Sequence, residues 1–185
     1  MALNATIYKV ELQISDMDRH YYATHALTLA RHPSETEERL MVRLLAFALY
    51  AQDRLEFGRG ISDEDEPALW RKDYTDEIEL WIELGQPDEA RIRKACGRAH
   101  QVVVINYGGN TADIWWSKVG AALARHKNLS VLDIPATTVA SLLPLLQRGM
   151  RLQALIQDDQ LQLMNDAESV TIDPAQRMGV AETLS

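Results

Sequence analysis

The sequence contains a single cysteine, Cys96, among its 185 residues. One thiol excludes a disulfide within the chain and a CxxC metal or redox motif. The chain also lacks a run of about 18 apolar residues, so we expect no transmembrane helix. Its N-terminus has no basic stretch followed by an apolar stretch, which indicates no secretory signal. Together these absences predict a cytoplasmic protein that does not associate with membranes.

Basic residues are also scarce. The chain has 19 Lys and Arg against 27 Asp and Glu, which gives a formal charge of −8. Nonspecific binding to nucleic acid depends on clustered Lys and Arg, so this charge opposes a nucleic-acid-coating role. It is still compatible with an enzyme that has a local basic patch beside acidic metal ligands. Nucleic acid and protein partners both stay open, and nothing in the sequence indicates an oligomeric state.

Several motifs of nucleotide-binding proteins and hydrolases are missing. The sequence has no phosphate-binding P-loop, no strand-linked Gly-x-Gly-x-x-Gly and no Gly-x-Ser-x-Gly elbow. Its five histidines show no close zinc-ligand spacing. A surface or hydrogen-bonded histidine is therefore the better interpretation of each one.

The patterns that are present predict a folded α/β protein. The hydrophobic fraction of 46% and the charged fraction of 25% are ordinary for a globular domain. Apolar periodicity predicts the order β-β-α-β-β-α-β-α-β-α-β-β-β, with no repeat and no linker. We predict a single domain over residues 1–185, with a mixed central β-sheet flanked by helices and a loose tail from about residue 173.

The first predicted helix begins at Ser34 and runs to about Gln52. Ser34 and Glu37 have the spacing of a capping box, in which each side chain bonds a free amide of the first turn. The box explains Glu37 but leaves Glu38 unexplained. Because Glu38 lies three residues before Met41, it falls at the end of the apolar stripe and can point along the sheet.

The stretch from Glu79 to Glu89 predicts a strand that runs into a helix. Alternation places Trp81 and Glu83 on one face of the strand. Glu83 stands at the carboxyl end, where open α/β sheets tend to build their sites. The helix begins near Pro87, which suits a first turn, and Lys94 lies two turns into it.

Acidic residues are the class that points to chemistry. Asp65 and Glu66 lie on a loop that enters a strand, and Glu83 ends the next strand. Carboxylates on neighbouring elements can gather a hard divalent cation such as Mg²⁺. A nearby lysine, here Lys94, can stabilise a phosphate transition state or orient water.

Each of these residues also has an ordinary interpretation. The Glu38 carboxylate can simply interact favourably with the dipole of the helix, whose positive end lies at the N-terminus. Residues 63–66 can form a solvated loop, Glu83 can be an exposed strand residue, and Lys94 can belong to a solvated helix face. The joint arrangement, and no single residue, favours a functional site.

The chain contains four distinctive motifs: His32-Pro33-Ser34-Glu35-Thr36-x-Glu38-Arg39, Asp65-Glu66-Pro67-x-x-Trp70, Leu80-Trp81-Ile82-Glu83-Leu84-Gly85-x-Pro87-Asp88-Glu89-x-Arg91-Ile92-x-Lys94-Ala95 and Ile114-Trp115-Trp116. These motifs resemble those of the bacterial YaeQ family, and the likeness covers nearly the whole chain. The resemblance implies a small cytoplasmic protein with a variant of the PD-(D/E)XK, restriction-endonuclease-like fold.

The resemblance also implies roles for particular acids. The site of that superfamily uses a Glu on the first helix, an Asp on one strand, and Asp/Glu-x-Lys on the next. Carried onto this chain, Glu38 matches the helix acid, Asp65 or Glu66 approximates the strand acid, and Glu83 matches the acid of the last motif.

The lysine of the last motif is missing. Gly85 stands in its place and has no side chain. Lys94, on the following helix, could send its ammonium back to the same spot, and Gln86 is a weaker substitute. The Pro-Asp dipeptide of the superfamily motif is irregular in this chain as well, because Ala68, and not an aspartate, follows Pro67.

Two hypotheses follow. In the first, the chain is a Mg²⁺-dependent phosphodiesterase acting on nucleic acid, with Glu38, Glu83 and Lys94 as catalytic residues and with Asp65, Glu66 and Glu83 as metal ligands. In the second, it is a noncatalytic nuclease-fold module for protein–protein interaction or regulation. The first is the leading hypothesis, because three acids and a lysine fall on the matching elements. The second is motivated by the missing lysine and the net acidity.

Overall fold

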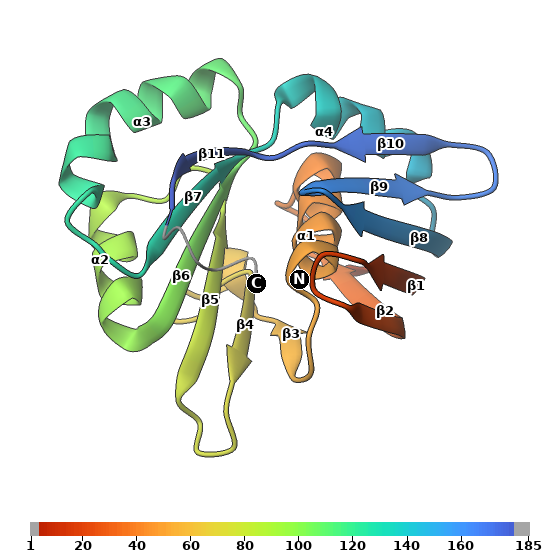
Figure 1. The fold of residues 1–185 in the computed structure, drawn as a ribbon, viewed down its shortest axis with the longest axis horizontal. Helices are drawn as coiled ribbons and strands as arrows, with labels where there is room; N and C mark the ends of the chain where they lie inside the picture. The colour runs from red at the N-terminus through yellow and green to blue at the C-terminus, as the bar shows by residue number, and fades with distance from the viewer. Residues whose placement is uncertain (1–3, 180–185) are drawn as a thin grey trace. The chain divides into compact units, whose positions relative to one another are not determined.

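The chain folds into two compact units, which the computed structural model describes over residues 4–179. Among the described residues, the first unit is formed by residues 4–51 and 137–173, and the second by residues 52–136 and 174–179. Each unit contains a mixed β-sheet with helices (Figure 1). The mixed α/β class is thus confirmed, although the strands form two sheets and not one central sheet. That the two units make up a single domain stays a prediction.

The first unit is built on a five-stranded sheet. Its strand order is β10-β9-β8-β1-β2, and β1 pairs parallel with β8 whereas the other neighbours are antiparallel. The strands are β1 (Thr6–Asp16), β2 (Tyr21–Arg31), β8 (Gly149–Gln157), β9 (Gln160–Met164) and β10 (Ser169–Ile172). The parallel pair joins residues about 140 apart in sequence, and local alternation carries no information about such a partner.

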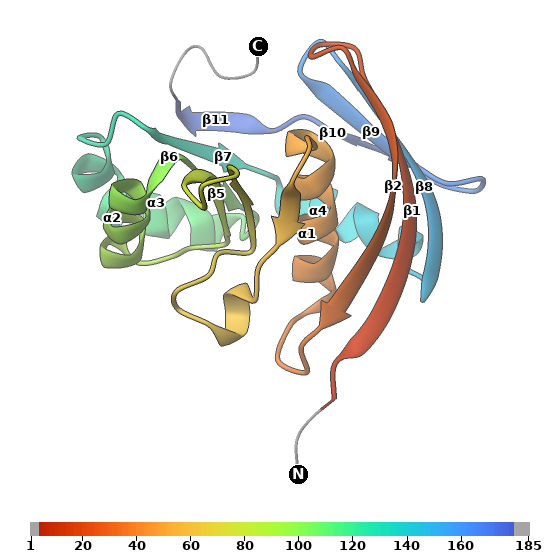
Figure 2. The same ribbon diagram turned by 90° about the horizontal axis from the view of Figure 1, so that it is seen from below.

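Helix α1 (Glu37–Tyr50) lies against the first sheet (Figure 2). Phe47 of α1 makes an edge-to-face contact with His25 of β2, with ring centroids 5.0 Å apart. The helix starts later than we predicted, because Thr36 is the N-cap and its hydroxyl accepts from the amide of Arg39 at 3.1 Å. The predicted capping box of Ser34 and Glu37 is therefore wrong, since Ser34 instead bonds His32.

The residue before this cap is a buried acid. Glu35 accepts from Arg39 at 2.5 Å and from Arg43 at 2.7 Å. Arg43 also donates to the carbonyl of Ala30, at the end of β2, at 3.0 Å. Burial lowers the pKa of Arg43, whereas the Glu35 carboxylate beside it raises that pKa. This ion cluster joins the start of α1 to the end of β2.

The first unit is completed by a short helix, α4 (Ala136–Leu142), whose last residues continue into the 3₁₀ turn η2 (Leu143–Leu145). The apolar pattern of residues 137–147 predicts one continuous helix, but the α-helix ends at Leu142, shortly before Pro144. Proline has no amide hydrogen to donate, so an α-helix accommodates it only in the first turn.

The second unit is built on a six-stranded sheet with the order β11-β7-β6-β5-β4-β3. The strands β5, β6 and β7 are parallel, and the remaining neighbours pair antiparallel. The bounds are β3 (Leu55–Phe57), β4 (Leu69–Lys72), β5 (Ile78–Leu84), β6 (Ala99–Asn106), β7 (Leu129–Asp133) and β11 (Ala175–Met178), with a 3₁₀ turn η1 (Gly60–Ser62) after β3. The three parallel strands place their carboxyl ends along one edge of the sheet.

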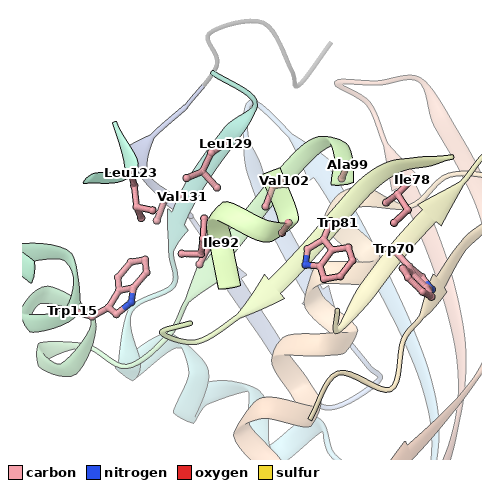
Figure 3. Close-up of a cluster of buried hydrophobic side chains, with 12 residues drawn as sticks. Trp70, Ile78, Trp81, Ile92, Ala99, Val102, Trp115, Leu123, Leu129 and Val131 are labelled. Atoms are coloured by element: carbon pink, nitrogen blue, oxygen red, sulfur yellow. The ribbon is translucent and has the colours of Figure 1, made fainter. Parts of the chain in front are cut away.

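Two helices, α2 (Glu89–Arg98) and α3 (Asn110–Leu123), cover one face of this sheet. Figure 3 shows their side chains meeting those of the strands in an apolar cluster. Trp81 of β5 is only 2% exposed and packs edge-to-face on Trp70. The face that carries Trp81 and Glu83 is therefore the face covered by α2, and both faces of β5 are buried.

Strand β11 lies within the tail that we expected to be loose. Arg177 of this strand forms ion pairs with Asp133, at the end of β7, and with Asp113 of α3. These contacts fix a strand whose own sequence alternates weakly, which is why the pattern missed it. The last residues of the predicted tail, 180–185, lie outside the described part of the chain.

Cys96 packs partly buried against the apolar cluster of the second unit. Burial raises the pKa of its thiol to about 11. The thiolate is the reactive form, so alkylation by iodoacetamide at pH 8.5 should be on the order of 100-fold slower than for an unperturbed cysteine. The rate, followed by mass spectrometry, should still rise between pH 9 and 10. A rate that levels off near pH 9 would contradict this expectation.

Candidate functional site

Glu83 is the central residue of the candidate site. It is the next-to-last residue of β5 and is only 6% exposed. Its Oε1 accepts from the indole Nε1 of Trp81 at 2.8 Å and from Nε of Arg91 at 2.8 Å. Trp81 comes two residues earlier on the same face of the strand. A buried carboxylate is thus held by one neutral donor and one cationic donor, which offsets the cost of removing it from water.

Arg91 connects Glu83 to the loop before β4. Its other two guanidinium nitrogens donate to the carbonyls of Glu64 and Glu66, each at 3.0 Å. The three nitrogens of one side chain therefore bind three oxygens from two segments of the unit. This is the fixed multidentate geometry for which arginine is suited.

The next basic residues of α2 bind the same loop. Lys94 Nζ donates to Oδ1 of Asp65 at 2.8 Å, and Arg98 donates to the carbonyl of Asp65 at 3.2 Å. Arg91, Lys94 and Arg98 are spaced three and four residues apart, so they share one face of the helix. The loop of residues 63–66 is consequently bound along this face by three cations and is not simply a solvated loop.

The Lys94–Asp65 pair is exposed to solvent. The hydrogen bond from Lys94, together with its charge, holds the pKa of the Asp65 carboxyl below its usual range. Because the folded-state pKa is lowered, this contact is present near neutral pH and is lost as pH falls through that lowered pKa.

Glu66 is paired on its other side. Its carboxylate accepts from the amide of Arg59 at 2.8 Å and faces the Arg59 guanidinium at 3.4 Å. Asp63 lies 3.8 Å from the same guanidinium. The acids that we predicted as metal ligands therefore each contact a basic residue.

Gly85 stands at the position of the missing lysine for a conformational reason. Its φ is +87°, a region in which side-chain-bearing residues are strained. Its amide still donates to the carbonyl of Ile105 at 2.8 Å and so extends the pairing with β6. The neighbouring Gln86 points its amide at Asn106 Oδ1, at 3.4 Å. The ammonium of Lys94 binds Asp65, in the loop of residues 63–66.

Glu38, the predicted helix acid, lies in the first turn of α1 and is half-buried. It belongs to the first unit, whereas Asp65, Glu66, Glu83 and Lys94 belong to the second. The structure brings those four residues together around one face of α2. A role for Glu38 beside them stays a prediction.

The acids predicted to bind Mg²⁺ lie beside cationic side chains of the same unit. The part of the chain from 4 to 179 contains no group of three or more His, Cys, Asp or Glu residues that could hold a metal ion. A divalent cation takes several oxygens that converge on one point. Here the Arg91 guanidinium stands between the Glu83 carboxylate and the backbone of Glu66.

Arg91 is the residue that the sequence interpretation missed. We had treated the basic residues of this helix as a solvated face. The spacing of Arg91, Lys94 and Arg98 along one face, directly after an acidic loop and an acid at a strand end, was the available signal. Spacing alone, however, does not show which acid each cation binds.

No helix within residues 4–179 is both long enough and apolar enough to span a membrane.

Comparison with known proteins gives consistent results. The family model described as YaeQ protein matches residues 1–174. The chain is 47% identical over 172 residues to YaeQ of Salmonella typhi and 44% identical over 172 residues to YaeQ of Escherichia coli K12. Each alignment covers 93% of this chain and 95% of the relative.

Two solved structures have the same fold as this chain. The crystal structure of YaeQ from Xanthomonas axonopodis pv. citri matches with a TM-score of 0.91 and 58% identity, covering 95% of this chain and 99% of that one. The crystal structure of YaeQ from Pseudomonas syringae matches with a TM-score of 0.91 and 36% identity, covering 95% and 97%.

Proposed function

This chain belongs to the YaeQ family, and we propose that it is a noncatalytic module of PD-(D/E)XK-like fold that binds a protein partner in the cytoplasm. One observation carries the proposal. The Glu83 carboxylate, the acid expected to bind metal, accepts from Trp81 and from Arg91 within its own unit. A catalytic metal ligand has to offer its oxygens to the ion, whereas this carboxylate already has a cation beside it.

The surrounding charges support the same proposal. Asp65 is paired with Lys94, and Glu66 with Arg59. A lysine that is paired with an acid of the loop has to leave that acid before it can stabilise charge on a phosphate. The net charge of −8 adds to this, because phosphate backbones are repelled by an acidic protein.

The experiment is a cleavage and binding assay on the intact chain. We expect no cutting of single-stranded or double-stranded DNA or RNA in Mg²⁺ or Mn²⁺, and no heat of Mn²⁺ binding at millimolar metal by calorimetry. Glu83→Ala is the matched control. Metal-dependent cutting that Glu83→Ala abolishes would overturn the proposal.

A second candidate function is a Mg²⁺-dependent phosphodiesterase that acts on nucleic acid. It is favoured by one observation, that Asp65, Glu66, Glu83 and Lys94 meet around one face of α2. In this candidate Asp65, Glu66 and Glu83 hold Mg²⁺, which supplies an activated water when bound, while Lys94 stabilises charge and Glu38 assists. The arginine beside Glu83 has to leave before the carboxylate is available.

Arg91→Gln separates the two candidates. It removes the cation beside Glu83 and leaves a shorter, neutral polar side chain at that position. The noncatalytic proposal expects Mn²⁺ binding to stay absent in this variant. Binding that appears in Arg91→Gln and disappears in Arg91→Gln with Glu83→Ala would instead favour the metal-dependent function, with Arg91 as the group that blocks the site.

A further inference from the structure

Strand β2 forms a long open edge of the first sheet (Figure 1). It runs for 11 residues, and within residues 4–179 β1 is the only strand that pairs with it. Near its end the carbonyl of Ala30 accepts from Arg43 of α1, so the edge is open up to that residue. The other strands at sheet edges are much shorter, with 4 residues in β10, 4 in β11 and 3 in β3. Proteins usually protect exposed edges by keeping them short or by placing Lys, Pro or a bulge on them. Strand β2 has no proline, no lysine and a regular register.

Both rows of side chains along this edge are accessible. The outward row includes Tyr22, which is 61% exposed. The row that faces α1 is only half-buried at Tyr21, Ala23, His25 and Leu27. A neighbouring strand would complete the burial of this second row and would bond the open backbone groups.

We propose that β2 is a dimerisation edge, on which β2 of a second copy pairs antiparallel about a two-fold axis through Ala26. Ala26 is the middle residue of the strand, so only this register aligns all 11 residues. The Ala30 carbonyl at each end of the pair stays bound to Arg43, and the residues between the two ends bond one another. It places Thr24 opposite Thr28 of the second copy, and Tyr22 opposite Ala30. Small and threonine side chains face one another across the centre, an arrangement that favours close strand pairing.

The charges on the strand fit a second copy. In this register Arg31 lies opposite Tyr21 and His25 lies opposite Leu27, so no two like charges meet. None of the 27 acidic residues of the chain falls between Tyr21 and Arg31. Each molecule has a net charge of −8, so two copies repel one another. The repulsion between nearby side chains is weakest at this edge, because it has no acidic residue.

The extent of the edge is sufficient for a specific interface. An antiparallel pair of 11-residue strands forms on the order of 10 backbone hydrogen bonds, and roughly 8 remain when the Ala30 carbonyl of each copy stays bound to Arg43. That number lies within the range of a typical protein–protein interface. The remaining repulsion between the two acidic molecules is long-ranged and is screened by salt. Dimerisation is therefore stronger at 0.5 M than at 0.05 M salt.

Sedimentation equilibrium of the full chain, from micromolar to millimolar concentration, tests this assignment. The wild type is expected to be a dimer in the upper part of that range. Ala26→Lys brings two lysines together on the axis and should raise the dissociation constant at least about 10-fold. Thr171→Lys, at an exposed position of the other edge strand β10, is the matched control and should dimerise like the wild type.

A charge-swap experiment distinguishes a specific loss of dimerisation from misfolding of the variant. Ala26→Lys and Ala26→Glu should each be monomeric with an unchanged circular dichroism spectrum, since position 26 is exposed. An equimolar mixture of the two should restore a dimer, because the axis now joins opposite charges. A wild type that stays monomeric at millimolar concentration, or a mixture that fails to associate, overturns the proposal.

Discussion

Glu35→Gln is expected to lower the free energy of unfolding by about 3–5 kcal/mol, the usual cost of removing one partner from a buried ion pair. The side chain of Glu35 is 1% exposed and binds Arg39 and Arg43. Glutamine keeps the volume but removes the negative charge. Arg43, whose side chain is 7% exposed, would then remain buried without its carboxylate.

Urea denaturation gives the measurement, with two probes that report different parts of the chain. All four tryptophans lie in the second unit, so their fluorescence follows that unit, whereas far-ultraviolet circular dichroism follows both. The lower stability of the first unit should appear as a lower urea midpoint in the circular dichroism signal. Coincident shifts in both signals would show that the two units unfold together, as a single domain does.

Two further variants sharpen this prediction. Glu37→Gln, at an exposed acid in the first turn of α1, should cost only about 0.3–1 kcal/mol through the helix dipole. The double variant Glu35→Leu, Arg43→Met should recover much of the loss, because an apolar pair often replaces a buried ion pair at little cost. A Glu35→Gln loss as small as that of Glu37→Gln would contradict the assigned role.

Trp81→Ala is expected to destabilise the second unit by about 3–5 kcal/mol, the range for deleting a large buried aromatic side chain. Trp81 is 2% exposed and packs on Trp70 with ring centroids 5.9 Å apart. The guanidinium of Arg98 lies over its ring at 5.1 Å. The substitution leaves a cavity and also removes a donor from the buried Glu83 carboxylate.

Trp81→Phe separates these two contributions. It keeps most of the ring but removes the indole donor, so we expect a loss of about 1.5–3 kcal/mol, the range for a hydrogen bond to a charged group. Tyr74→Ala, at a residue that is 92% exposed, should change stability by about 0.5–1 kcal/mol, since it loses only the contact with Arg54. Urea denaturation followed by circular dichroism checks all three. Equal losses for Trp81→Ala and Tyr74→Ala would refute the expectation.

Sequence patterns predicted most of the elements well. Alternation predicts a strand over residues 5–14, and a continuous apolar run predicts another over residues 101–107. Both ranges agree with β1 and β6 to within two residues at each end. Sequence patterns failed where a strand is held in place by residues that are far away in the sequence. Strand β11 depends on Arg177 reaching two acids on other elements, and no local pattern records those contacts.

The candidate site was predicted in part. Position at a strand end identified Glu83, and residue type identified Lys94 and the acids of the loop. The pairing among them was not predictable, because an acid on one element can bind any cation that the fold brings within reach. Gly85, which looked like a defect in a nuclease motif, is required by its positive φ.

By itself the sequence determined the family resemblance, the mixed α/β class and the acids that gather near α2. Those features depend on local periodicity and on residue identity, which a linear chain carries in full. Only the tertiary structure decided that the strands divide between two sheets, and that the Glu83 carboxylate is bound to Arg91. Both depend on which distant segments meet, because hydrogen bonds and ion pairs act over a few ångströms and require the whole fold to select their partners.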